Sequence, residues 1–330
     1  NSKHYSVPVS GGKAVELKEH KGLINDKNIS LDGKWTLSDK EVKINNVDGK
    51  DFYPELEKSD VKIYDALDYR HWDTFNHGNH NHVILTNANG EEIDIMKDEP
   101  YDAPQKPFGG DEDYIWSPDG TKIIYVCKKK AGTAYATSTN TDLYEYNLVT
   151  KITKNLTESN LGYDTAPQYS PKGDLTWLQM KRDGYEADKN DIIVRYKGQD
   201  LNLTSNWDGT VDSFSWSNNG KKVYFIAPIN GTKQLFFIEF QGSKKISFEV
   251  NQLTDGDFDV NAIVGFSETA VLVTRTDMNH APEVYSYDLT KKTWNQVTKV
   301  NNEAYAKINS CKTEKRWINT TDGKKMLVWV

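Results

Sequence analysis

A phrase that recurs four times along this chain of 330 residues is the feature that most constrains its fold. "WSPDGTKIIYVC" at Trp116 returns as "YSPKGDLTWLQM" at Tyr169, "WSNNGKKVYFIA" at Trp216 and "GFSETAVLVTRT" at Gly265, at spacings of 53, 47 and 49 residues. Each copy is followed by a second apolar strand and then by a closing phrase, in turn "KNLT", "LNLT", "NQLT" and "NQVT". A nearly constant period in this range indicates a repeat architecture, in which each unit stacks on its neighbours.

The order of signals within each repeat predicts a small antiparallel sheet. Ser-Pro-Asp-Gly is typical of a type I turn, because Pro presets φ, Asp bonds back to the backbone and Gly takes the left-handed conformation. The turn leads into alternating strands, about four in each repeat. Such sheets must cover both faces and protect their edges, which radial closure achieves. We therefore predict an all-β fold, a β-propeller of four-stranded blades, rather than a β-sandwich with chance internal similarity.

The repeat also predicts how the chain is divided. Residues 111–310 contain the four clear copies and are expected to form four blades. Residues 1–45 carry a looser copy, "YSVPVSGGKAVEL" and "ISLDGKWTLSD", which predicts one or more partial blades. Residues 46–110 break the pattern and are interpreted as an insertion, with a short helix or turn near positions 53–59 and a two-strand ribbon. Residues 311–330 are expected to form an exit strand.

Composition excludes two classes of partner. The formal net charge of −7 and the absence of a Lys/Arg stripe argue against binding to nucleic acid. No apolar run approaches the ~20 residues of a membrane helix. The opening "NSKHYSVPV" is expected to be a strand rather than a leader, so that any targeting segment was removed or never included.

Cys127 and Cys311 match no metal spacing and are predicted to be small buried hydrophobes rather than a disulfide. The sequence leaves open whether the chain forms a homo-oligomer.

Common catalytic signatures do not occur in the sequence. It contains no Gly-x-Ser-x-Gly, no Gly-rich phosphate loop, no Cys-x-x-Cys and no His-Glu-x-x-His, so we expect neither a self-contained catalytic site nor a cofactor. The stretch "YRHWDTFNHGNHNH" brings together His71, His77, His80 and His82. Because no carboxylate or Cys accompanies them at metal-ligand spacing, we interpret the stretch as a flexible hairpin loop and predict that it binds no metal.

Two other stretches are candidate binding sites. "KRDGYEADKND", residues 181–191, joins two strands that a four-residue hairpin could have joined. Carboxylates held on a rim beside Arg or Tyr can bind an ammonium group, although a solvated hairpin tip with ion pairs worth roughly 0–1 kcal/mol would look the same. Arg70, Trp72 and Asp73 are secondary candidates, as a rigid cluster at a strand end or as a structural Trp beside a paired Arg and Asp.

Several motifs together resemble a known family. They are "YRHWDTF", "GYDTAPQYSP", "MKRDGYEADKN", "GTVDSFSWSNNGKKVYF" and the terminal "EKRWINTTDGKKMLVWV". In order and spacing they are similar to the propeller half of bacterial dipeptidyl peptidases and acylaminoacyl peptidases of the prolyl oligopeptidase family, closest to the dipeptidyl peptidase 5 type of Bacteroidetes. The resemblance covers positions from about 64 to 330 and is looser before that.

The resemblance implies a secreted or periplasmic serine exopeptidase whose propeller caps an α/β-hydrolase domain and filters its peptide substrates. In that family the segment like "DGKKMLVWV" leads into the hydrolase domain, so the chain is expected to be a piece of the enzyme or to work with a separate catalytic chain. The alternative is a stand-alone periplasmic propeller that binds protein or glycan. A glycosidase or sialidase propeller comes third, because its Asp box needs a residue between Asp and Gly, which are adjacent here.

The family also implies a role for the 181–191 stretch. A dipeptidyl peptidase must hold the free amino terminus of its substrate, and the resemblance implies that the propeller supplies the carboxylate that does so. We predict Glu186 as this anchor, because it is flanked by a Gly, an aromatic side chain and charges of both signs. Tyr185 is expected to pack beside Glu186, and Arg182 and Asp188 are expected to hold the loop.

Overall fold

The chain folds into two compact units, one of residues 26–202 and one that combines residues 1–25 with 203–330, here called the 203–330 unit. A computed structural model describes residues 4–8, 12–17, 27–56, 58–67, 69–71, 73–106, 109–242 and 248–330. No helix within these ranges is long and apolar enough to cross a lipid bilayer.

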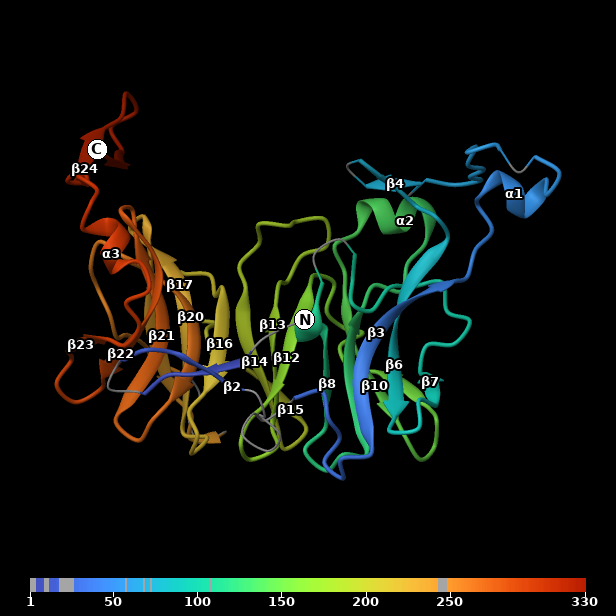
Figure 1. Cartoon of the computed structure of the whole chain (residues 1–330), viewed down its shortest axis with the longest axis horizontal. Coiled ribbons are helices and arrows are strands. Elements are labelled where there is room, and N and C mark those ends of the chain that lie inside the picture. Colours follow the sequence, from blue (N-terminus) through green and yellow to red (C-terminus); the bar gives the residue numbers. More distant parts are fainter. Residues whose placement is uncertain are drawn as a thin grey trace. The chain divides into compact units, whose positions relative to one another are not determined.

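Four sheets of the described residues each consist of four antiparallel strands in sequence order, which confirms the predicted blades (Figure 1). The 26–202 unit contains two of them, formed by β8 (Tyr114–Trp116), β9 (Lys122–Cys127), β10 (Asp142–Asn147) and β11 (Thr153–Asn155), and by β12 (Asp164–Tyr169), β13 (Leu175–Gln179), β14 (Asp191–Tyr196) and β15 (Gln199–Asn202). The 203–330 unit contains the others, formed by β16 (Ser213–Trp216), β17 (Lys222–Ile229), β18 (Thr232–Glu239) and β19 (Val250–Gln252), and by β20 (Asp259–Phe266), β21 (Ala270–Asp277), β22 (His280–Asp288) and β23 (Trp294–Gln296).

The repeated turn has the predicted geometry. Between β8 and β9 the Gly120 N–H donates to the Ser117 carbonyl at 2.9 Å, and Gly120 has φ of +68°. The Ser117 hydroxyl donates to Asp119 Oδ1 at 2.6 Å and accepts the N–H of Lys122 at 2.9 Å. The turn therefore satisfies its own polar groups and directs the chain straight back into the second strand.

The closing phrase of each repeat ends in a Thr, and in three of the described sheets this hydroxyl plays the same part; in one of them Thr298 Oγ1 accepts the N–H of Val284 at 2.8 Å. Thr157 Oγ1 accepts the N–H of Leu143 at 3.0 Å, and Thr254 Oγ1 accepts the N–H of Leu235 at 2.9 Å. Thr254 also donates to Gln234 Oε1 at 2.8 Å. The last strand of these sheets is thus fastened to the third strand by one side chain.

A three-stranded sheet precedes the four-stranded ones in the 26–202 unit. It has the order β3-β6-β7, from β3 (Trp35–Lys43), β6 (Asn79–Asn87) and β7 (Glu92–Asp94). Between β3 and β6 lie helix α1 (Gly49–Phe52) and a ribbon of β4 (Arg70–His71) and β5 (Thr74–Phe75). The helix ends just before the predicted interval of 53–59, which contains turns. The predicted division of the chain at residues 45, 110 and 310 stays a prediction.

The remaining elements are short. Helix η1 (Asp111–Asp113) precedes β8, and α2 (Gly132–Thr137) lies between β9 and β10. In the 203–330 unit, β1 (His4–Ser6) pairs with β2 (Val15–Leu17), and β24 (Lys315–Asn319) pairs with β25 (Lys325–Trp329). Figure 1 shows the β24–β25 ribbon extending beyond the end of the sheet β20–β23, with α3 (Asn302–Tyr305) between them.

Alternate residues of the inner strands pack against different neighbouring sheets. Along β9, Ile123 and Tyr125 belong to a core cluster with Leu85 of β6, whereas Ile124 belongs to a cluster with Trp177 of β13. In the 203–330 unit another cluster joins β17 and β18 to β20 and β21. A period of two therefore lets one strand bury both of its faces, which is how a stack of blades forms a continuous core.

Candidate functional site

The 181–190 loop connects β13 to β14 and is closed by one clamp. Arg182 Nη2 lies 2.9 Å from Asp188 Oδ1, and both the Nε and the backbone N–H of Arg182 donate to Asp188 Oδ2 at 3.1 Å. The guanidinium also lies 4.0 Å from the centre of the Tyr185 ring. Hydrogen bonds from Arg182 hold the pKa of Asp188 at about 2, so the clamp is charged at neutral pH.

The predicted anchor Glu186 is exposed on this loop. It makes no hydrogen bond or ion pair with the other described residues, in contrast to Asp188. Burial raises the pKa of Tyr163, and the negative charge of Glu186 raises it further by a smaller amount. Tyr185 packs under Arg182 and is 54% exposed. The roles predicted for Glu186 and Tyr185 are not decided by these contacts and stay predictions.

Helix α2 lies close to the 181–190 loop and to Ala66, which precedes the ribbon that carries Arg70. A Cβ placed on Gly132, its first residue, would lie 3.5 Å from the Cβ of Ala66, and one placed on Gly184 would lie 4.0 Å from the carbonyl oxygen of Thr137. Figure 1 shows β4 and α2 at the same end of the 26–202 unit. The ribbon that follows Ala66 and the 181–190 loop therefore approach opposite ends of one short helix.

Two of the three secondary candidates, Arg70 and Asp73, lie on that ribbon. Arg70 and Asp73 are both exposed, and the ion pairs of the described residues do not join them. Asp73 Oδ1 accepts a long hydrogen bond of 3.5 Å from Thr74. Trp72 lies outside the described residues. Nothing in these contacts gives the Arg70, Trp72 and Asp73 group a binding role.

A buried carboxylate, Asp164 of strand β12, lies opposite Gln179, the last residue of β13 before the loop. Asp164 Oδ1 accepts hydrogen bonds from Trp177 Nε1 at 2.7 Å and Gln179 Nε2 at 2.8 Å, and Oδ2 accepts one from Asn160 at 3.0 Å. Asn160 also donates to the carbonyl of Met180, where the loop begins. Burial raises the pKa of Asp164 to about 6, although these hydrogen bonds lower it.

The His-rich stretch is not the flexible hairpin loop that the sequence suggested. His80 and His82 lie in strand β6 and are buried, and each Nδ1 pairs with a carboxylate, at 3.0 Å to Asp102 and at 2.8 Å to Asp94. The prediction was wrong here because the carboxylates come from residues 12 to 22 positions further along the chain. Within the described ranges no group of three or more His, Cys, Asp or Glu side chains is arranged to hold a metal ion.

His82 has two partners that can only accept hydrogen bonds. Its Nδ1 faces the Asp94 carboxylate, and its Nε2 lies 2.9 Å from the carbonyl oxygen of Glu99. Both ring nitrogens must therefore donate, which requires the charged imidazolium. Burial lowers the pKa of His82, but the hydrogen bond and charge of Asp94 and the Glu99 carbonyl outweigh it, so that the pKa is raised.

We expect the stability that His82 contributes to decrease as the pH rises. A group whose native pKa is raised stabilises the fold fully below its unfolded value of 6.5 and loses this contribution as the pH passes the native value. The difference in free energy of unfolding between the wild type and His82→Gln, measured in urea from about pH 6 to about pH 9, should shrink. A difference that is constant or grows over this range would contradict a charged His82.

The two cysteines differ from each other. Cys127 is buried, as predicted, and burial raises the pKa of its thiol well above the usual value. Cys311 is exposed, so the expectation of burial was wrong for it. Both are free thiols, as expected.

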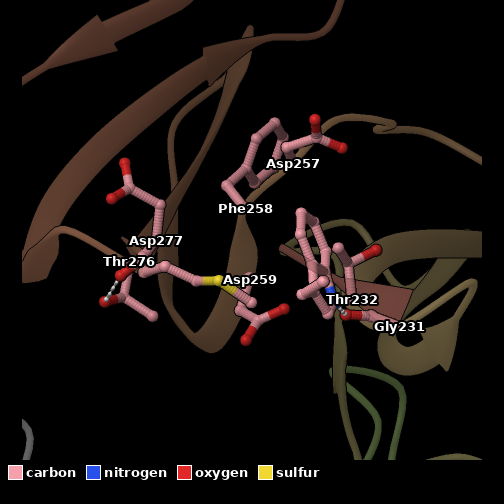
Figure 2. Close-up of a pocket in the computed structure, with 9 residues that line it drawn as sticks. Gly231, Thr232, Asp257, Phe258, Asp259, Thr276 and Asp277 are labelled. Atoms are coloured by element: carbon pink, nitrogen blue, oxygen red, sulfur yellow. Dashed lines mark hydrogen bonds between the residues drawn. The ribbon is translucent and has the colours of Figure 1, made fainter. Parts of the chain in front are cut away.

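A small pocket of about 130 Å³ lies in the 203–330 unit (Figure 2). Two of its carboxylates are engaged, since Asp257 pairs with Lys315 at 2.8 Å and Asp277 pairs with His280 at 2.8 Å. The pocket marks the place where β25 meets the tips of the hairpins β17–β18 and β21–β22. Its lining consists of Gly231, Thr232, Asp257, Phe258, Asp259, Thr276, Asp277, Met278 and Trp329.

One residue of the loop, Asp183, had no role predicted from the sequence. Asp183 Oδ1 accepts hydrogen bonds from Ser138 Oγ at 2.7 Å and from the Thr139 N–H at 2.8 Å. These partners precede β10 in the neighbouring sheet, about 45 positions earlier. A local pattern carries no signal for such a contact, whereas the Arg182–Asp188 clamp spans only six positions.

Comparison with known proteins identifies relatives of this chain. Residues 187–326 match the family model of the dipeptidyl peptidase IV N-terminal region. The chain is 36% identical over 308 residues to dipeptidyl-peptidase 5 of Porphyromonas gingivalis, which covers 91% of this chain and 44% of that protein. It is also 36% identical over 310 residues to dipeptidyl-peptidase 5 of Porphyromonas endodontalis, with coverage of 91% and 43%. The chain thus spans less than half the length of these relatives.

Solved structures show the same fold at low identity. Pyrococcus horikoshii acylaminoacyl peptidase superposes with a TM-score of 0.63 at 15% identity, over 96% of this chain and 45% of that one. Porphyromonas gingivalis dipeptidyl peptidase 4 superposes with a TM-score of 0.56 at 12% identity, over 94% and 42%. The sequence matches confirm the resemblance drawn from the motifs, since the chain is similar to the N-terminal part of dipeptidyl peptidases, and the solved structures confirm the β-propeller fold.

Proposed function

We propose that this chain is the substrate-orienting propeller of a serine exopeptidase that removes dipeptides from the free amino terminus of a peptide. The propeller covers the active site of an α/β-hydrolase domain, admits peptides, and receives their terminal ammonium on Glu186. The observation that carries this proposal is the state of the loop: Glu186 is exposed and has no hydrogen-bond or ion-pair partner among the described residues, while the neighbouring Asp183 and Asp188 are hydrogen-bonded.

The chemistry of this arrangement suits an ammonium ligand. A carboxylate and an ammonium form a charge-assisted hydrogen bond, which is about twice as strong as a neutral one. Because the Arg182–Asp188 clamp already closes the loop, binding orders few additional groups and loses little of this energy. A carboxylate at a fixed place would measure the distance from the amino terminus to the bond that is cut.

The β24–β25 ribbon supports the presence of a further domain. Ile318 is 42% exposed and Met326 47% exposed, and the two lie opposite each other on one face of this two-stranded sheet. Exposed apolar patches of this kind mark surfaces that contact other protein. The proposed occupant is the hydrolase domain, and the greater length of the matched relatives is consistent with it. We place the parent protein in the periplasm or outside the cell, as its family resemblance implies.

Peptidase assays of the parent protein test the proposal directly. It should hydrolyse a dipeptide reporter with a free amino terminus, lose this activity to a serine-directed inhibitor, and cleave the N-acetylated reporter at least tenfold more slowly. Equal rates on the free and the acetylated reporters would contradict amino-terminal recognition. A parent without peptidase activity would favour the alternative of a propeller that binds protein or glycan.

This chain by itself is expected to hydrolyse no dipeptidyl reporter. An activated nucleophile needs an adjacent base and an oxyanion hole, and the 330 residues contain no Gly-x-Ser-x-Gly motif. The measurement is the release of a chromogenic amine by the purified chain over several hours. Turnover that a serine-directed inhibitor abolishes would contradict the expectation.

A further inference from the structure

The 181–190 loop is attached at two places, and only one of them lies within the loop. The Arg182–Asp188 clamp closes the loop on itself, whereas Asp183 bonds to Ser138 and Thr139, which precede the third strand of the neighbouring sheet. We propose that Asp183 is the positioning residue that fixes the loop, and with it Glu186, against residues 138–139. This inference rests on the proposed function of Glu186.

Hydrogen bonds run in both directions across this contact. Asp183 Oδ1 accepts from the Ser138 hydroxyl and the Thr139 N–H, while the N–H of Gly184 donates to Thr139 Oγ1 at 2.9 Å. Thr139 Oγ1 also lies 3.5 Å from the carbonyl of Arg182. Three consecutive loop residues are therefore held, and the last of them is only two positions before Glu186.

The charge of Asp183 strengthens the contact. Burial raises its pKa, but the hydrogen bonds from Ser138 and Thr139 and the charge of Lys130 outweigh burial and lower the pKa overall. The carboxylate is thus ionised at neutral pH, and its hydrogen bonds are of the stronger, charge-assisted kind. Gly184, the next residue, has φ of +81°, which turns the chain sharply directly after the contact.

The residues that receive Asp183 are themselves firmly held. Ser138 and Thr139 are buried, and two positions later Thr141 forms a parallel bridge with Tyr163. The Thr141 hydroxyl also accepts the N–H of Asp164 at 3.0 Å and donates to its carbonyl at 2.9 Å. The contact therefore ties the loop to a hydrogen-bonded edge of the neighbouring sheet.

The first test is hydrogen exchange in this chain. In Asp183→Ala the amides of residues 182–186 should exchange at least about tenfold faster, because the loop loses its bonds to Ser138 and Thr139 and the Gly184 N–H is no longer held against Thr139 Oγ1. Asp183→Asn, which keeps Oδ1 as an acceptor, should retain most of the protection. Asp200→Ala is the matched control, since it removes an exposed carboxylate, paired with Arg195, from the same sheet. Unchanged exchange in a folded Asp183→Ala chain would refute the positioning role.

A second variant approaches the contact from the other side. Ser138→Ala removes one donor and leaves the loop sequence intact, so it should increase exchange in residues 182–186 by a smaller factor than Asp183→Ala. If Asp183→Ala does not fold, Ser138→Ala alone tests whether this contact positions the loop. Exchange in Ser138→Ala as slow as in the wild type would then contradict the proposal.

Kinetics of the parent protein separate this inference from the proposed function. Asp183→Ala should raise KM for a substrate with a free amino terminus about 3- to 30-fold and change kcat less than about twofold, with rescue by Asp183→Asn. Faster exchange together with an unchanged KM would leave the attachment standing and contradict the role of Glu186. Unchanged exchange would refute the attachment, whatever the kinetics.

Discussion

Glu186→Gln in the parent protein should lower kcat/KM for a dipeptide substrate with a free amino terminus by about 10- to 1000-fold, mainly through KM. The reason is the loss of a charge-assisted pair, worth about 1.5–4 kcal/mol when its partner is left without a counter-charge. Glu186 is exposed and makes no hydrogen bond within the described part of the chain, so the melting temperature should change by no more than about one or two degrees. Steady-state kinetics and a thermal melt together measure both effects.

Two controls show whether the effect belongs to Glu186. Glu158→Gln removes an exposed carboxylate from the turn that precedes the same sheet and should leave kcat/KM within about twofold. A substrate with an acetylated amino terminus should be cleaved equally, and slowly, by wild type and Glu186→Gln. If Glu186→Gln unfolds the protein while its folded fraction keeps a normal kcat/KM, the loop is structural and the anchor lies elsewhere.

Asp164→Ala should destabilise the 26–202 unit by about 3–5 kcal/mol. The substitution leaves the buried Trp177 Nε1 without its acceptor and removes the partner of Gln179 and Asn160, and each unpaired buried donor costs about 1–3 kcal/mol. For a unit of this size the melting temperature should fall by roughly 10 °C. Denaturant unfolding, followed by tryptophan fluorescence, measures the change.

Asp174→Ala is the matched control for this stability effect. Asp174 lies in the turn between β12 and β13 of the same sheet and accepts a hydrogen bond from the Ser170 hydroxyl at 3.0 Å. Because it is only partly buried, its loss should cost less than about 1 kcal/mol. Equal effects of Asp164→Ala and Asp174→Ala would show that the buried network contributes nothing beyond an ordinary turn contact.

Local signals in the sequence were enough to predict the blades. The turn at Ser117 needs only six neighbouring residues to satisfy its hydrogen bonds, so a short pattern specifies its geometry and the strands on both sides. The Arg182–Asp188 contact is equally local. The turn and the strands that follow it recur along the chain, which makes them visible without an alignment.

Contacts between distant residues could not be predicted in this way. Asp183 finds its partners about 45 positions earlier, and His82 finds a carboxylate twelve positions later in another strand. A single sequence shows that Asp183 and His82 are polar, but not that the fold brings acceptors or donors to them. For the same reason the sequence identified the loop as a candidate site and left unassigned the residue that attaches it.

The closing Thr of the repeat has a consequence for how such chains change over evolutionary time. A duplicated or deleted segment is tolerated best when its two cut ends leave no polar group unsatisfied. A segment that runs from one closing Thr to the next carries its own turn and its own fastening hydroxyl, as Thr157 and Thr254 illustrate. Genetic recombination can therefore add, remove or exchange a whole segment, while the side chains that face ligands, which lie in the connecting loops, diverge independently.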